Sequence, residues 1–149
     1  MRIRQLNHSV YQVLYHIVWG TKYRRKFLKH YVRSELVKNL YSSLKRHPDW
    51  FIHRINTGDD HVHLLMEIPP CYTVAAVAQE LKSNSSAHLR MSFKFVDKMY
   101  DHSGIWSTGY FVSTVGLNED NIRRYIERQN NYDRGVDVTM EFQQPNSHE

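Results

Sequence analysis

The sequence lacks the features that mark disulfide-stabilised, zinc-finger and membrane proteins. Its 149 residues include a single cysteine, Cys71, so an intramolecular disulfide and a cysteine-rich zinc site are both excluded. No apolar run reaches the roughly 18 residues that a transmembrane helix requires, and the charged N-terminus is not followed by the apolar core of a signal peptide. Internal repeats and low-complexity linkers are also absent. We therefore expect one soluble cytoplasmic domain, long enough to bury a core.

Charge of both signs is present, but it is unevenly distributed along the chain. Residues 1–54 contain twelve Lys and Arg against two acidic residues, whereas residues 55–149 contain eight against thirteen, which together give the net charge of +5. A basic half of a small protein favours a polyanionic partner, because each contact to a phosphate releases condensed counterions.

The densest basic cluster interleaves cations with an aromatic ring. It consists of Lys22, Tyr23, Arg24, Arg25 and Lys26. Aromatic rings among cations suit a single-stranded nucleic acid, whose exposed bases can stack on them. We therefore predict that these five residues bind a single-stranded nucleic acid, and a solvated basic loop is the alternative interpretation of the same cluster.

Hydrophobic periodicity predicts an α+β domain. β-Branched and aromatic residues mark the strands, and apolar residues every three or four positions mark the helices. In chain order the pattern predicts a strand over 10–19, a helix over 30–47, strands over 50–56 and 61–68 around a turn at 57–60, a helix over 73–91, a mostly irregular stretch with a helical piece over 93–107, a strand over 110–115 and a helix over 118–132.

This order matches the ferredoxin-like, split βαβ arrangement, which is an antiparallel sheet with two helices on one face. The last helix is additional to that arrangement. We expect a single domain over residues 1–149, with its core at about 10–132 and a polar tail at 133–149.

Two histidines in the third predicted strand are candidates for binding a metal ion. Residues i and i+2 of a strand point to the same face, so His61 and His63 project together while Val62 faces the core. Two neutral imidazoles at this spacing can share a divalent ion. The H-x-H triplet alone is a weak signal in a chain with ten histidines, and an unliganded pair on a solvated face is the alternative. His16, on the first predicted strand, could lie near the pair.

The last predicted helix places a tyrosine and a glutamine on one face. Tyr125 and Gln129 are four residues apart, which is about one helical turn. Three nearby arginines, Arg123, Arg124 and Arg128, would attract phosphate and favour the phenolate of Tyr125. Such help is needed because a phenol with a pKa of ~10 is a poor nucleophile. The alternative is a surface helix whose tyrosine only packs.

Five segments in this order resemble the single-tyrosine HUH transposases of bacterial and archaeal insertion sequences, the IS200-like transposases. The segments are His16 to Tyr23 (HIVWGTKY), His61 to Met66 (HVHLLM), Leu81 to Ser86 (LKSNSS), Trp106 to Gly116 (WSTGYFVSTVG) and Ile122 to Gln129 (IRRYIERQ). The resemblance covers about residues 10–132. One segment could arise by chance, whereas five in the right order are specific.

The resemblance implies a role for each candidate residue. His61 and His63 correspond to the HUH pair, Gln129 to the third protein ligand of Mg²⁺ or Mn²⁺, and Tyr125 to the nucleophile. In that family the tyrosine attacks single-stranded DNA whose ends carry small imperfect hairpins. The attack leaves a 5′-phosphotyrosine and a 3′-OH, and strands are rejoined without ATP. The pattern assigns no role to Tyr132.

The resemblance also implies an assembly and a location. It implies a homodimer whose active sites can be composite between two copies, acting at the nucleoid without a membrane anchor. Whether Tyr125 meets the histidines of its own chain or of a partner depends on the connection around 115–118.

Three other interpretations are open. A non-catalytic module of ferredoxin-like fold that binds single-stranded DNA or RNA would use Tyr11, Tyr15, Tyr23 and Trp19 as contacts. Such a module would not need a tyrosine–glutamine face opposite an H-x-H strand. A relative retained for housekeeping would use the same chemistry on chromosomal repeat palindromes. A zinc hydrolase is disfavoured because no carboxylate lies at helical spacing with the histidine pair.

Overall fold

The main sheet has four antiparallel strands in the order of a split βαβ fold. The computed structural model describes residues 4–6, 9–11, 13–114 and 119–134. Its main sheet has the order β4-β5-β3-β6. The strands are β3 (Leu14–Gly20), β4 (Phe51–Thr57), β5 (His61–Glu67) and β6 (Phe111–Ser113). Every neighbouring pair is antiparallel, which matches the predicted sheet.

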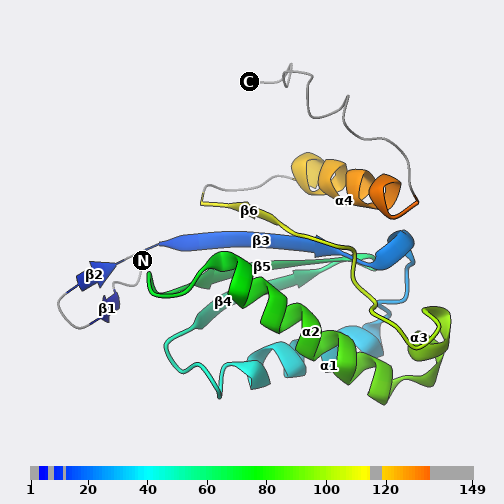
Figure 1. Cartoon of the computed structure of the whole chain (residues 1–149), viewed down its shortest axis with the longest axis horizontal. Helices are drawn as coiled ribbons and strands as arrows, with labels where there is room; N and C mark the ends of the chain where they lie inside the picture. Colours follow the sequence, from blue (N-terminus) through cyan, green and yellow to red (C-terminus); the bar gives the residue numbers. More distant parts are fainter. Residues whose placement is uncertain (1–3, 7–8, 12, 115–118, 135–149) are drawn as a thin grey trace.

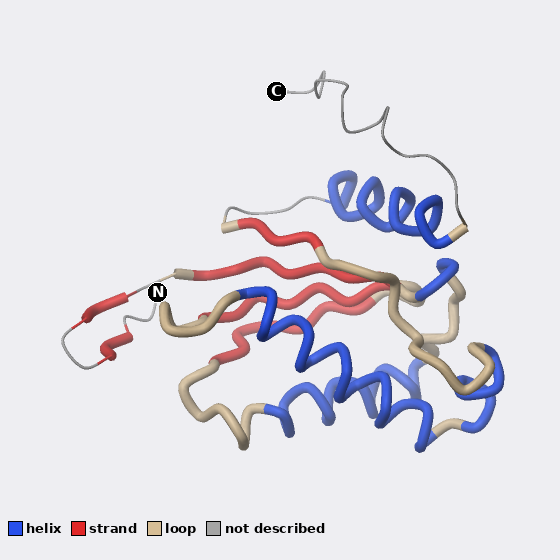
Figure 2. The backbone as a smooth tube through the Cα atoms, viewed as in Figure 1, coloured by secondary structure: helices blue, strands red, loops and turns tan. Residues whose placement is uncertain are grey.

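Helices cover both faces of this sheet (Figure 1). α1 (His30–Ser43) and α2 (Val74–Ser92) pack together on one face, and the short α3 (Lys94–Met99) follows α2. α4 (Glu119–Asp133) lies on the opposite side of the sheet, so that the strands lie between two helical layers (Figure 2). The start of α2 is set by Thr73, whose side chain accepts a hydrogen bond from the backbone N–H of Ala76. The predicted ferredoxin-like, α+β fold is confirmed.

Alternation along the central strands gives the sheet two chemically different faces. Val62, Leu64 and Met66 of β5 are fully buried in the core that α1 and α2 cover. Ile17 and Trp19 of β3 are buried in the same core. Because successive side chains of a strand point to opposite faces, the residues between them face α4. The prediction that the two histidines of β5 project from one face, opposite the core, is confirmed.

Two predicted boundaries differ from the structure by more than two residues. Residues 9–11 form β2 (Ser9–Tyr11), which pairs with β1 (Arg4–Leu6) in a separate hairpin, so the strand predicted over 10–19 is in fact two strands. Neither proline nor glycine lies between the two strands, so composition did not mark the break. α1 ends at Ser43, one turn earlier than predicted.

Some of the predictions made from the sequence concern residues that the structure does not describe. In the described ranges no helix is long and apolar enough to cross a membrane. The connection 115–118 lies outside the described residues, as do residues 135–149 of the predicted polar tail. Predictions about those two segments therefore stay predictions.

Candidate active site

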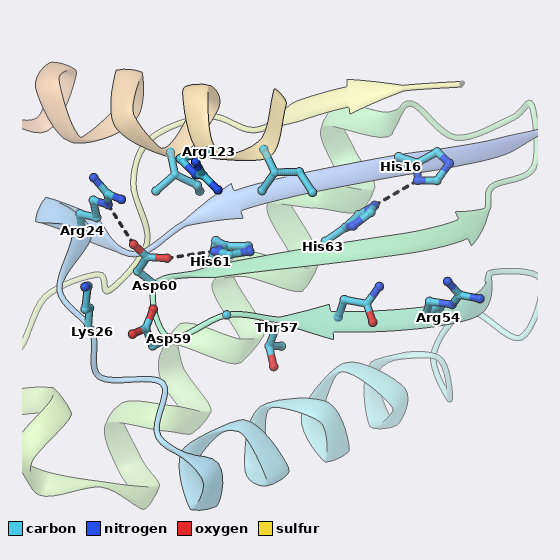
Figure 3. A pocket seen from close by; sticks show the side chains of 14 residues that line it. His16, Arg24, Lys26, Arg54, Thr57, Asp59, Asp60, His61, His63 and Arg123 are labelled. Carbon is cyan, nitrogen blue, oxygen red and sulfur yellow. Dashed lines mark hydrogen bonds and ion pairs between the residues drawn. The ribbon is translucent and has the colours of Figure 1, made fainter. Parts of the chain in front are cut away.

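A cleft of about 670 Å³ opens between α4 and the turn that joins β4 to β5 (Figure 3). Its floor is the face of the sheet opposite the core. The lining residues are His16, Arg24, Lys26, Arg54, Asn56, Thr57, Gly58, Asp59, Asp60, His61, His63, Ile122, Arg123 and Ile126. Both histidines of the H-x-H triplet thus share a cleft with four Lys and Arg side chains, a combination that suits a phosphate-bearing ligand.

His63 is held against His16 of the neighbouring strand. Val18 of β3 is opposite His63 in the sheet, and Nδ1 of His16 lies 3.0 Å from Nε2 of His63. Burial lowers the pKa of His63, and the nearby His16, His61 and Arg54 lower it further. His63 is therefore a neutral imidazole at pH 7, which is the form that binds a metal ion. The predicted proximity of His16 is confirmed.

His61 is anchored by a buried carboxylate. Oδ1 of Asp60 lies 2.9 Å from Nδ1 of His61, and Oδ2 accepts a hydrogen bond of 3.0 Å from Nε of Arg24. Burial by itself would raise the pKa of Asp60, but the hydrogen bonds and charges of His61 and Arg24 outweigh it, so the pKa lies below its usual value. Our sequence reasoning missed Asp60, although this residue directly precedes the H-x-H triplet.

The predicted DNA-binding cluster is divided by the turn that it forms. Lys22–Arg24 make a 3-10 turn in which Tyr23 and Arg24 have positive φ angles of 60° and 54°. Arg24 and Lys26 line the cleft, whereas Lys22, Tyr23 and Arg25 do not. Tyr23 instead contacts cations, with Nζ of Lys22 at 5.4 Å and Cζ of Arg25 at 5.2 Å from its ring centre. The structure therefore brings two of the five predicted contacts to the histidines.

Among the described residues, one of the aromatic contacts of the alternative binding module is buried and two are engaged by other parts of the chain. Trp19 is fully buried in the core, and Tyr15 packs against that core. Tyr23 is engaged by its cationic neighbours, and the side chain of Tyr11 lies outside the described residues. The assignment of Trp19 as a nucleic-acid contact is wrong, because its ring is inaccessible.

α4 docks with Tyr125 packed against β6, and Tyr125 is not among the residues that line the cleft. Tyr125 is 7% exposed and packs with Ile126 against Val18. Its ring centre lies 5.8 Å from that of Phe111 on β6. The residues of α4 that line the cleft are Ile122, Arg123 and Ile126. Within this chain the structure therefore does not bring Tyr125 into the cleft that holds the two histidines.

The polar atoms of the tyrosine face are buried and have no hydrogen-bond partner among the described residues. These atoms are the hydroxyl of Tyr125 and Oε1 of Gln129. Burial raises the pKa of Tyr125, and Asp133 raises it further. We predicted that nearby arginines would favour the phenolate of Tyr125. For this arrangement that prediction is wrong, because Arg123 and Arg124 are exposed while the phenol is buried.

Two residues that our sequence reasoning missed organise the loop beneath the end of α4. Oδ2 of Asp133 accepts hydrogen bonds from the backbone N–H of Tyr23 at 3.1 Å and from the hydroxyl of Ser107 at 2.5 Å. Nζ of Lys82 donates to the carbonyls of Ser107 and Gly109 at 2.7 Å each, and burial lowers the pKa of Lys82 to about 8. Their partners are remote in sequence, so no local pattern marks either residue.

The close approach of α4 to β3 requires Gly20. A Cβ atom added at Gly20 would lie 2.9 Å from Cδ1 of Ile126, so Gly20→Ala must displace that side chain or lift the helix. We expect unfolding free energy to fall by about 1 kcal/mol, the low end for overpacking, because Cδ1 is the tip of a flexible side chain. Hydrogen exchange in α4 should become faster. Gly104→Ala is the control, since no atom lies within 4 Å of its added Cβ, and equal exchange in the two variants would contradict the prediction.

Comparison with known proteins shows the family to which this chain belongs. The family model described as "Transposase IS200 like" matches residues 9–129. The chain belongs to the IS200-like transposase family. The region that matches the IS200-like transposases contains all four predicted site residues, His61, His63, Tyr125 and Gln129.

Individual relatives agree with this membership. The chain is 34% identical over 129 residues to the transposase for insertion sequence element IS200 from Salmonella typhimurium, and the match covers 85% of this chain and 82% of that protein. It is 27% identical over 121 residues to the ISDra2 transposase TnpA from Deinococcus radiodurans, with 80% and 86% covered.

Two solved structures share the fold of this IS200-like family member. A crystal structure of a candidate transposase from Deinococcus radiodurans has a TM-score of 0.76 and 26% identity, covering 85% of this chain and 97% of that one. A REP-associated tyrosine transposase bound to a REP hairpin has a TM-score of 0.51 and 13% identity, covering 83% and 68%. At 13% identity the likeness shows the fold alone.

Proposed function

We propose that this protein is a transposase that cuts and rejoins single-stranded, hairpin-ended DNA through Tyr125. The observation that carries the proposal is the cleft, because the H-x-H pair lies on its floor, cationic side chains line it, and the helix that bears Tyr125 forms one wall. Membership of the IS200-like transposase family supports DNA transposition as the process. We infer from action on DNA that the protein works at the nucleoid.

We infer that His61 and His63 would hold a divalent metal ion, Mg²⁺ or Mn²⁺. The donor chemistry fits, since two imidazoles share one strand face and His63 is neutral at pH 7. Within the described residues no group of three His, Cys, Asp or Glu side chains is suited to a metal, and we infer that Gln129 would supply the third donor. The amide oxygen of Gln129, buried without a partner there, supports that role. When bound, the ion would polarise the scissile phosphate and stabilise the leaving oxygen.

Tyr125 supplies the nucleophile in the proposed reaction. Its phenol oxygen forms a bond to the scissile phosphorus as the bond from phosphorus to the 3′ oxygen breaks. The phenol gives up its proton and the leaving oxygen gains one, so the products are a 5′-phosphotyrosine and a free 3′-OH. A 3′-OH from a second cleavage then attacks the phosphotyrosine and releases Tyr125. Each step exchanges one phosphate ester for another, and therefore no ATP is consumed.

The docked position of α4 supports an active site that is composed from two chains. In this position Tyr125 lies against Phe111 of β6 and Gln129 lies beside Gly109, and both leave buried polar atoms without partners among the described residues, which is unfavourable for both groups. We infer a homodimer in which α4 of each copy moves to place Tyr125 beside the histidine cleft of the other copy. The connection 115–118, on which such an exchange depends, lies outside the described residues.

Lys26 offers a direct test that the cleft contacts DNA. Arg24 is engaged by Asp60 and Glu127, whereas Lys26 is exposed and lines the cleft. Lys26→Gln should weaken binding to single-stranded DNA several-fold at low salt and reduce the slope of log K against log salt by ~0.7, the value for one lost phosphate contact. Lys98→Gln on α3 removes an equal, exposed charge outside the cleft. Equal losses in the two variants would argue against a contact specific to the cleft.

The function itself is tested with a labelled single-stranded oligonucleotide that carries a hairpin. The protein is incubated with this DNA and Mg²⁺ or Mn²⁺, and the products are separated on a denaturing gel. We expect a protease-sensitive protein–DNA band and a shorter strand with a free 3′-OH, both prevented by a chelator. Hairpin binding without either product across both metals would overturn the strand-transfer assignment and favour a binding module.

A further inference from the structure

A chain of hydrogen bonds connects the basic turn after β3 to the first histidine of the H-x-H pair. Nε of Arg24 donates to Oδ2 of Asp60 at 3.0 Å, and Oδ1 of the same carboxylate lies 2.9 Å from Nδ1 of His61. The three side chains meet at one end of the cleft (Figure 3). Asp60 is 6% exposed, so water competes little for its carboxylate and the contacts are strengthened by the low local dielectric.

The backbone holds these groups in place from both sides. The N–H of Thr21 donates to the carbonyl of Asp60 at 2.9 Å, which ties the end of β3 to the β4–β5 turn. Arg24 has a φ of 54°, a conformation that residues other than glycine rarely adopt. Such a conformation persists where surrounding contacts enforce it, and the guanidinium contact to Asp60 is one of those contacts.

The carboxylate determines which nitrogen of His61 is available. An ionised carboxylate only accepts hydrogen bonds, so the hydrogen of the neutral His61 ring must reside on Nδ1. That tautomer leaves the lone pair on Nε2, the atom that can then bind a metal ion. His63 is oriented differently, because its Nε2 atom lies against Nδ1 of His16.

We propose that Asp60 is a positioning residue that fixes the tautomer and orientation of His61 for metal binding, and that Arg24 holds the carboxylate in place. This inference rests on the proposed function, in which His61 is a metal ligand. It also gives Arg24, a predicted DNA contact, a second task within the histidine site. Asp60 touches neither substrate nor metal in this role and acts through His61.

The first measurement uses metal-free protein near neutral pH. Long-range ¹H–¹⁵N correlation spectra report which ring nitrogen of each histidine carries the hydrogen. We expect the Nδ1–H form of His61 in the wild type and in Asp49→Asn, and a shift towards the Nε2–H form in Asp60→Asn. Asp49→Asn is the matched control because it makes the same chemical change at an exposed carboxylate outside the cleft. An Nε2–H tautomer in the wild type overturns the proposal without any variant having to fold.

The second measurement is Mn²⁺ affinity, followed by electron paramagnetic resonance of the free ion. We expect Asp60→Asn to bind Mn²⁺ about 10- to 100-fold more weakly, the usual range for a group that orients a ligand. Asp60→Glu should recover part of the affinity, and Asp49→Asn should retain all of it. Equal affinities of Asp60→Asn and the wild type would overturn the proposal.

His61→Ala separates this inference from the function on which it rests. If His61→Ala binds Mn²⁺ as tightly as the wild type, His61 is not a ligand and the metal assignment fails. If His61→Ala loses Mn²⁺ while Asp60→Asn keeps it, the metal assignment stands and the role of Asp60 fails. Loss in both variants, with the tautomer change in Asp60→Asn, supports both.

Discussion

Tyr125→Phe is expected to reduce formation of the covalent protein–DNA adduct by a factor on the order of 10³ or more, while hairpin binding stays close to that of the wild type. The substitution removes the oxygen that would join to phosphorus and keeps the ring that packs against Val18 and Phe111. Because the hydroxyl is buried without a partner among the described residues, its loss should not lower the thermal unfolding temperature. Adduct formation is measured on a denaturing gel with labelled hairpin DNA.

Tyr132→Phe is the matched control for this result. Tyr132 lies two helical turns further along α4 and is 58% exposed, so the same chemical change is made outside the buried face. We expect its adduct yield to equal that of the wild type. If the adduct persists in Tyr125→Phe and disappears in Tyr132→Phe, the nucleophile is Tyr132 and the assignment of Tyr125 is wrong.

His63→Ala is expected to abolish metal-dependent cleavage. The loss of activity should exceed about 100-fold, which is the upper range when a residue that only orients a metal ligand is removed. The variant removes one of the two imidazoles of the H-x-H pair, and the third imidazole that lines the cleft, His16, lies on β3 and not on the strand of His61. Cleavage is measured as a function of Mg²⁺ and Mn²⁺ concentration. His88→Ala is the control, because His88 pairs with Glu35 between α1 and α2, outside the cleft.

Mixing the two inactive variants tests the composite site. If the tyrosine of one copy serves the histidines of the other, a dimer of one Tyr125→Phe chain and one His63→Ala chain retains one site with both residues intact. Random assortment of two chains then restores about a quarter of the wild-type sites. Mixtures that stay inactive after verified subunit exchange would contradict the proposed arrangement in trans.

Local patterns were sufficient to predict much of the fold and one half of the site. The alternation from His61 to Met66 placed both histidines on the face opposite the core, because strand side chains alternate whatever lies around them. The spacing of Tyr125 and Gln129 placed them on one helical face for a similar reason. The hairpin of β1 and β2 was missed, since Arg4–Leu6 contains no β-branched or aromatic residue and no proline or glycine separates β2 from β3.

The orientation of α4 shows where local patterns are insufficient. The face that bears Tyr125 docks on Val18 and Phe111, and the approach is close because position 20 has no side chain to keep Ile126 away. These contacts join segments that are remote in sequence. The arginines near Tyr125 therefore could not be used to predict its ionisation. Burial of the phenol raises the pKa of Tyr125, and the sequence pattern of arginines does not reveal that burial.

By itself the sequence determined the order of strands and helices, the common face of His61 and His63, and the common face of Tyr125 and Gln129. Only the tertiary structure decided that neither Tyr125 nor Gln129 lines the cleft of His61 and His63 in this arrangement, and that Asp60 joins Arg24 to His61. The physical reason is that some interactions are local in the sequence and others join residues that are remote in the sequence. Periodicity is a property of a single element of backbone, whereas docking, burial and hydrogen bonding between elements depend on side chains that only folding brings together.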